Sequence, residues 1–187
     1  MEPVTFIATY KHVFVIIHVL AVVVGMGSAI VTDILSLRFG FNKVLSTFEV
    51  YIIRYLSKVV TIALALIVLT GLLTFLSNPE GYLASVKFLT KMTVVGVLVI
   101  NGYLLHKYVF THIGDKNIFS SPKKRRLRKT GFALGAISLV SWVSALGLGI
   151  LLHIPVSYDT AIGIYIVILV LAVAVSQYLE WRFLERR

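Results

Sequence analysis

Four ionisable residues inside long apolar stretches are the strongest sign of chemistry in this sequence. His18 and Asp33 lie fifteen residues apart, and so do Lys91 and His106. On an α-helix this spacing corresponds to about 60° of rotation and roughly 22 Å of rise. Each helix therefore presents one ionisable side chain near each of its ends. Charge within a membrane span is costly, so these residues are candidates for a functional site.

Membrane-spanning helices are the elements that must position these residues. The chain is 58% hydrophobic with a mean hydropathy of +0.94, far above the values of soluble domains. Five apolar stretches are long enough to cross the hydrocarbon core. We therefore predict an all-α integral membrane protein, multi-pass in a cell membrane and most simply a prokaryotic plasma membrane. Residues 1–187 are expected to form a single bundle of five transmembrane helices, over residues 13–35, 57–76, 87–110, 131–153 and 161–181.

The distribution of basic residues predicts the orientation of the bundle. When the five spans are threaded, all but three of the 18 Lys and Arg residues fall on one side. The positive-inside rule then places the N-terminus outside and the C-terminus in the cytoplasm. The basic run Lys123–Lys129 directly precedes a span, so we interpret it as a topology determinant that also contacts anionic lipid headgroups. The net charge of +10 is thus no indication of a nucleic-acid partner.

Two connecting segments carry readable signals. Apolar residues recur at helical spacing over residues 41–56, which predicts an amphipathic helix. This helix either lies on the cytoplasmic surface or extends the second span inward. His153-Ile-Pro155 is expected to end the fourth span, because proline cannot continue the helical hydrogen bonds. The chain has no cysteine, so thiolate metal sites and disulfides are excluded.

In the inner half of the bundle, the predicted topology gathers a second set of polar residues. These are Asp33, Asn101, His106 and, at the edge, His112. A buried carboxylate–imidazole pair between Asp33 and His106 would satisfy both groups, and the same residues could form a metal or proton site. Alternatively, Asp33 caps its helix or pairs with Arg38.

Two stretches, His12–Ile34 and Val86–Val109, resemble a superfamily of small bacterial membrane proteins. It includes the HemJ-type protoporphyrinogen oxidases and the membrane domain of the copper-resistance protein CopD. The resemblance covers the first three spans and implies that His18 is an axial haem ligand and that Lys91 is its essential partner. The arginine and aromatic residues usual in the first span of HemJ-type proteins are missing. The chain therefore looks like a relative of these oxidases rather than one of them.

The residues themselves are compatible with haem b. In the outer half, His18 and His153 are the histidines available as an axial pair. Lys91 would then approach a haem propionate or carry a proton, and we expect it to turn inward because Lys87 already supplies a charge at the interface. The small residues Gly25 and Ala29, on the stripe of His18, leave space for a flat cofactor or simply allow close helix packing.

Three functions follow from these observations. The leading hypothesis is a haem-binding membrane protein with a redox or electron-transfer role. If the chain acts like the HemJ-type oxidases, its substrate would be a porphyrin. The second is a cation or proton-coupled transporter that uses the Asp, His and Lys residues. Five spans show no inverted repeat, although a homo-oligomer could supply the missing symmetry. The third is a structural membrane subunit whose polar residues hold the helices together. Hydrolase and phosphate-loop motifs are absent.

Overall fold

Five long helices dominate the structure. The computed structural model describes residues 7, 9–41, 45–113 and 124–182. Within these ranges all regular structure is helical. The long helices are α2 (Lys11–Phe41), α3 (Thr47–Leu76), α5 (Val86–Leu104), α6 (Arg125–Ile150) and α7 (Tyr158–Glu180). The short helix α4 (Pro79–Leu83) joins α3 to α5, and a π-helix, η1 (Leu105–Phe110), continues α5. Each of the five long segments is long and apolar enough to cross a membrane, which confirms the predicted all-α membrane fold.

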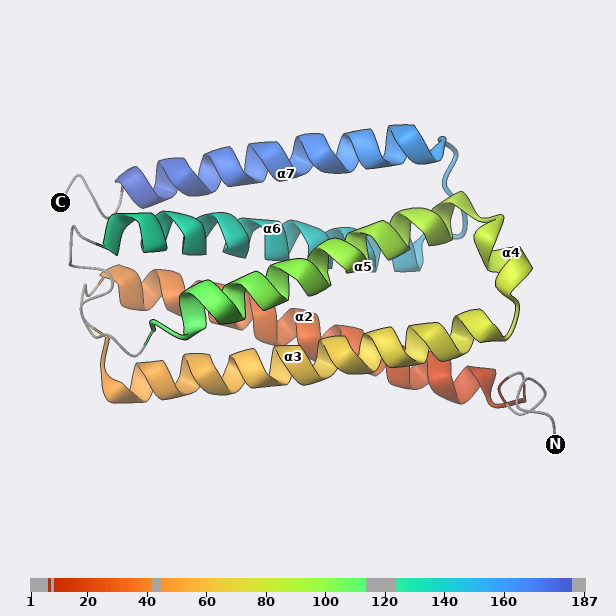
Figure 1. The fold of residues 1–187 in the computed structure, drawn as a ribbon, viewed down its shortest axis with the longest axis horizontal. Coiled ribbons are helices and arrows are strands. Elements are labelled where there is room, and N and C mark those ends of the chain that lie inside the picture. The colour runs from red at the N-terminus through yellow and green to blue at the C-terminus, as the bar shows by residue number, and fades with distance from the viewer. Residues whose placement is uncertain (1–6, 8, 42–44, 114–123, 183–187) are drawn as a thin grey trace.

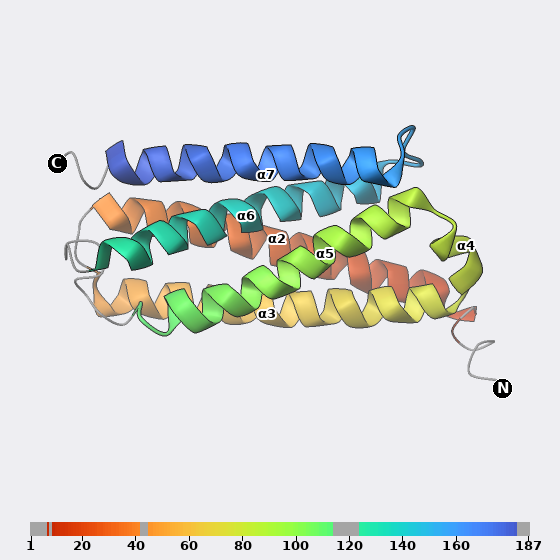
Figure 2. The same ribbon diagram turned by 45° about the horizontal axis from the view of Figure 1, so that its top comes forward.

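The helices run side by side along one axis and alternate in direction (Figures 1 and 2). Helices α2 and α3 form an antiparallel pair, and α6 packs against both α5 and α7. Helix α7 lies on the outside of the bundle (Figure 1). The bundle has two ends. We call the end where α3 and α6 begin the basic end, and the end where α2, α5 and α7 begin the far end.

Local sequence signals explain most helix boundaries. Helix α3 begins with a capping box, in which the Ser46 side chain accepts from the Glu49 backbone and the Glu49 carboxylate accepts from the Ser46 backbone. Ser85 and Ser157 cap α5 and α7 with a single hydrogen bond each, in which the serine side chain accepts from a backbone N–H. Within α3, the amphipathic stretch from residue 47 onward extends the second span. This supports one of the two interpretations of residues 41–56, whose first part lies outside the described residues.

Several helices extend beyond the predicted spans, and the ends of the third and fourth spans differ in kind. Helix α6 ends at Ile150 rather than at residue 153, because Leu151 already has an extended backbone. Pro155 therefore follows the helix end instead of causing it. The third span ends in the π-helix η1, whose hydrogen bonds connect residues five apart rather than four. The wider turn changes the direction in which residues 105–110 project.

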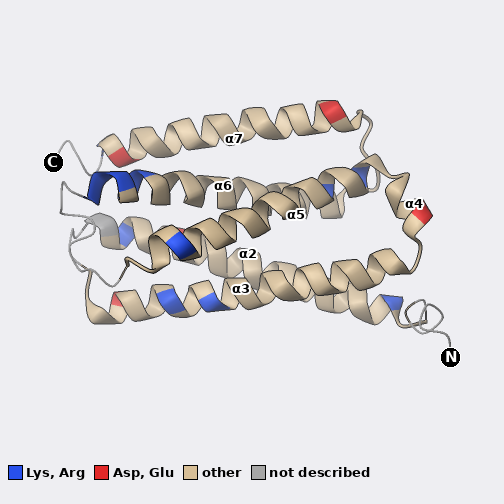
Figure 3. Cartoon of the chain, viewed as in Figure 1, with Lys and Arg blue, Asp and Glu red and all other residues tan. Residues whose placement is uncertain are grey.

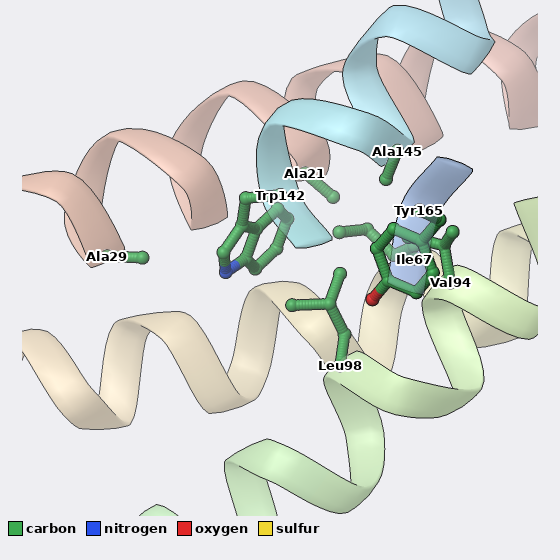
Figure 4. Packing of buried hydrophobic residues seen from close by; sticks show 8 residues of the cluster. All are labelled: Ala21, Ala29, Ile67, Val94, Leu98, Trp142, Ala145 and Tyr165. Atoms are coloured by element: carbon green, nitrogen blue, oxygen red, sulfur yellow. The ribbon is translucent and has the colours of Figure 1, made fainter. Parts of the chain in front are cut away.

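The core of the bundle lies where α2, α3, α5 and α6 meet, with one residue contributed by α7. Figure 4 shows its buried residues: Ala21, Ala29, Ile67, Val94, Leu98, Trp142, Ala145 and Tyr165. The Trp142 indole reaches across to α2, where a Cβ on Gly25 would lie 2.7 Å from it. A glycine at position 25 is therefore required for this approach. Small residues of this kind let membrane helices pack closely.

The outer surface of the bundle is apolar. Val170, Leu171 and Ile100 are about as exposed as surface residues of soluble proteins, at 62%, 60% and 62%. In a bilayer these side chains contact lipid, where exposure carries no hydrophobic penalty. The location in a cell membrane is thus supported by the surface as well as by helix length.

Basic residues gather at the basic end, mainly on α3 and α6 (Figure 3). Arg54, Lys58 and Arg126 are exposed there. The far end holds Lys11, Lys87 and Lys91. Lys43, Lys116, Lys123, Arg186 and Arg187 lie outside the described residues. The asymmetry agrees with the pattern from which the orientation was predicted, and the orientation itself stays a prediction.

Candidate functional site

His18 and Lys91 meet in the half of the bundle nearer the far end. Helix α2 carries His18 about two turns from its start, and α5 carries Lys91 in its second turn. The Lys91 Nζ lies 3.4 Å from Nε2 of His18, and the other ring nitrogen, Nδ1, lies 2.9 Å from Oγ1 of Thr70 on α3. Three helices therefore contribute to one chain of polar contacts, and Lys91 turns inward as expected.

The direction of these hydrogen bonds can be worked out from their partners. The hydroxyl of Thr70 has one hydrogen, which it donates to the carbonyl of Leu66 at 2.6 Å. Its oxygen must then accept from Nδ1–H of His18. In the neutral imidazole this leaves a lone pair on Nε2, which accepts from the Lys91 ammonium. His18 is thus held as the Nδ1–H tautomer between a donor and an acceptor.

His153, the expected axial partner of His18, lies at the surface. His153 is exposed in the loop between α6 and α7, and no hydrogen bond joins these two described residues. Of the five histidines only His18 is withdrawn from the surface, since His12, His106, His112 and His153 are all exposed. A metal bond to Nε2 of His18 would require Lys91 to move away, because His18 already has a partner on each ring nitrogen. The axial pair for haem b stays a prediction.

The second predicted pair, Asp33 with His106, is not formed. His106 lies on η1 and is exposed, whereas Asp33 projects towards α6, with Oδ1 3.4 Å from the position of a Cβ on Gly135. His112 bonds its own neighbours, Thr111 and the Tyr108 carbonyl. Asn101 is buried and donates to the Leu134 carbonyl at 3.1 Å, while its Oδ1 has no partner in the described part of the chain. The four residues do not form one inner site.

Asp33 instead faces a cavity in the half of the bundle nearer the basic end. The cavity has a volume of about 380 Å³ and lies between the α2–α3 pair and helices α5, α6 and α7. Its walls are mainly apolar, and Trp142 bounds it on the side of the core. Polar lining residues are Thr32, Asp33, Ser36, Ser57, Thr61, Arg128, Ser138 and Ser176. The carboxylate of Asp33 makes no hydrogen bond within the described residues, so it is free to bind a ligand.

A buried ion pair lies beside this cavity, and sequence reasoning missed it. Arg128 of α6 donates from Nε to Oε1 of Glu180 on α7 at 3.2 Å, and Glu180 is fully buried. Its second carboxylate oxygen, Oε2, has no partner among the described residues. A signal is present in the sequence, because Glu180 is an acidic residue within an expected span. Arg128 belongs to the basic run Lys123–Lys129, so the sequence gives no reason to treat it differently from the other basic residues of that topology determinant.

The described residues contain no group of three or more His, Asp or Glu side chains that could hold a metal ion. The chemistry that the site can offer is therefore hydrogen bonding and charge. The His18–Lys91 contact has little space for a ligand between its members. The cavity offers volume, an unpaired carboxylate and several hydroxyl groups.

Comparison with known proteins gives one finding. The model of the family described as the C subunit of fumarate reductase matches residues 38–152, from the last turn of α2 to just beyond α6, which is more than half of the chain. The chain belongs to the fumarate reductase C-subunit family. Proteins of this family are membrane anchor subunits of an electron-transfer complex. No curated protein and no solved structure matches the chain.

This membership corrects the resemblance drawn from the sequence. The chain is not a HemJ-type or CopD-like protein, because the family that matches it is a different one. One histidine and one lysine in apolar surroundings carried the wrong inference. The match includes Lys91, Asn101 and Arg128, whereas His18 and Asp33 precede it.

Proposed function

We propose that this chain is the membrane anchor of a fumarate-reductase-type electron-transfer complex. The observation that carries the proposal is the family match over residues 38–152. The architecture supports it, since five candidate membrane spans with short connections make up most of the described residues. This is the structural-subunit interpretation among the three functions considered from the sequence.

The basic end is the surface on which we place the partner subunits. It presents exposed Arg54, Lys58 and Arg126, and the neighbouring α6 terminus adds further positive charge (Figure 3). Such a field attracts an acidic partner surface and speeds its association. The far end offers only three basic residues, among those described, and a short helix, α4, so it is the weaker docking surface.

Deletion of the chain tests the anchoring role. In cells that produce it, membranes and soluble fraction are assayed for fumarate reduction with a reduced artificial dye as electron donor. We expect the activity to sediment with the membranes and to move to the soluble fraction, or be lost, when the chain is deleted. Activity that stays on the membranes at its original level, or cells that show none in either fraction, would contradict the proposal.

The cavity suggests how an electron donor could enter the complex. Reduction of fumarate needs two electrons and two protons, and a donor dissolved in the bilayer would reach the anchor first. A hydroxyl-bearing ring of the quinol class suits a mainly apolar cavity of about 380 Å³ in which the Asp33 carboxylate accepts a hydrogen bond. Arg128 and the lining hydroxyl groups would contact the remaining oxygen.

Fluorescence of Trp142 offers a direct readout of this cavity. The chain has two tryptophans, and in a Trp181→Phe background only Trp142, which lines the cavity, remains. Titration with a short-chain benzoquinol should quench it, and Asp33→Asn should weaken the apparent affinity about tenfold, the loss of one hydrogen bond to a charged group. Asp159→Asn, an exposed carboxylate, is the matched control. Absence of quenching, or equal affinities of Asp33→Asn and Asp159→Asn, would show that the cavity does not bind the quinol.

A further inference from the structure

Two lysines of α5 lie side by side at the far end. Lys87 and Lys91 are four residues apart, so they share one face of the helix at a rise of roughly 6 Å. Lys87 donates to the backbone carbonyl of Leu151. Lys91 donates to His18, which Thr70 holds in place. Both ammonium groups are thus fixed in position by contacts with uncharged partners.

Neither lysine has a counter-ion in the described part of the chain. The carboxylates described at this end, Glu80 and Asp159, lie in the first turns of α4 and α7, are exposed and form no ion pair with either lysine. Lys91 uses one of its three N–H donors on His18, and two remain without a protein acceptor among the described residues. Two partly buried positive charges at a membrane boundary call for a negative charge from outside the chain.

The surroundings of the two lysines are typical of residues near lipid headgroups. Phe75, Tyr82 and Phe88 form an aromatic cluster there, with ring centroids 5.1 to 6.4 Å apart. The ammonium of Lys11 lies 5.5 Å above the ring of Tyr82. A tyrosine such as Tyr82, with lysines near the ends of membrane helices, is typical of the membrane–water interface. Lys91 lies one turn deeper than Lys87 and is still partly exposed, so a group reaching in from the interface can contact both.

We infer that Lys87 and Lys91 bind the phosphate group of an anionic membrane lipid, with His18 positioning Lys91. The phosphate oxygens accept from the two free donors of Lys91 and from Lys87, and the acyl chains lie against the exposed apolar side chains of α5, such as Leu89 and Met92. The site is separate from the cavity, which lies on the other side of Trp142 and shares no residue with it. It does not depend on the anchoring role.

Native mass spectrometry of the full chain in a neutral detergent tests this inference. The delipidated protein is titrated with phosphatidylglycerol and, separately, with zwitterionic phosphatidylcholine. We expect one tightly retained phosphatidylglycerol that phosphatidylcholine does not replace. Lys91→Met should lose this lipid, Lys87→Met should weaken its binding several-fold, and His18→Gln should weaken it less than Lys91→Met does. Lys91→Arg keeps the charge and should retain it.

Matched controls separate this site from general attraction to positive charge. Lys11→Gln, at the same end, and Arg126→Gln, at the basic end, should leave the retained lipid unchanged. Equal binding of both lipids by the unmodified chain would overturn the inference, and so would retention of the lipid by Lys91→Met. Inorganic phosphate should not displace the lipid at equal concentration; displacement would show that the site takes free phosphate, and would overturn the lipid assignment.

Discussion

In the two halves of this bundle, the ionisable residues His18 and Asp33 differ in whether they have hydrogen-bond partners. Towards the far end, both ring nitrogens of His18 form hydrogen bonds, one with Thr70 and one with Lys91. Towards the basic end, Asp33 lies beside a cavity of about 380 Å³ and makes no hydrogen bond within the described residues. Trp142 lies between the two regions. Equal spacing of ionisable residues in the sequence therefore produces a histidine with partners on both ring nitrogens in one half and a carboxylate without a described partner beside a cavity in the other.

The largest effect is expected from the ion pair at the basic end. Glu180→Gln removes the negative charge from the fully buried partner of Arg128. Breaking a buried pair in this way costs about 3–5 kcal/mol of unfolding free energy. The measurement is unfolding in mixed micelles by titration with a denaturing detergent. Asp159→Asn, at the exposed start of the same helix, should cost about 0.3–1 kcal/mol. Similar losses in the two variants would show that the pair does not hold the basic end together.

The packing of Trp142 against Gly25, which separates the two halves, gives the next effect. In Gly25→Ala the new Cβ would lie 2.7 Å from the indole and 3.0 Å from Ala63 Cβ, so the helices must move apart. Overpacking of this size costs about 1–3 kcal/mol. Gly27→Ala is the matched control, because beyond the backbone of its own helix and its chain neighbours no described atom lies within 4 Å of its Cβ. Alanine also favours the helix by up to about 1 kcal/mol. Equal free energies of unfolding for Gly25→Ala and Gly27→Ala would show that Trp142 does not pack tightly against α2.

The smallest effect should come from the network of the far half. Thr70→Val keeps the shape of the side chain but removes the acceptor for Nδ1–H of His18. Hydrogen bonds between membrane helices contribute about 0.6 kcal/mol on average, and up to about 1.7 kcal/mol. Thr74→Val removes a hydroxyl that bonds to the backbone of its own helix, so it should cost less. A reversed order of the two unfolding free energies would contradict the assigned network.

Much of the fold and part of the site could be predicted from the amino-acid order. The five spans are readable because apolar runs of membrane length are hard to mistake for anything else. The approach of Lys91 to His18 was also predictable, since parallel helices that start at one end place these residues at a similar depth. The structure shows no contact between Asp33 and His106, which is exposed on the π-helix η1, and a π-helix leaves no clear trace in a sequence.

Other features depend on information that a single span does not contain. Glu180 pairs with Arg128 across two helices, and each residue taken alone looks like an ordinary charge near a membrane boundary. The cavity is lined by residues of α2, α3, α5, η1, α6 and α7, Trp142 among them, so no single span reveals it. The family could not be inferred from a histidine and a lysine, whereas the match over residues 38–152 draws on the whole pattern of three spans.

Purification of the complex tests the central claim, the role as a membrane anchor, most directly. The chain is tagged, extracted from native membranes in a mild detergent, and the eluate is assayed for fumarate reduction per mole of chain. We expect activity to co-purify, and to fall when Arg54, Lys58 and Arg126 are changed together to glutamine but not in Lys11→Gln. A well-folded chain that elutes without fumarate-reducing activity, while the activity remains elsewhere in the extract, would contradict the account.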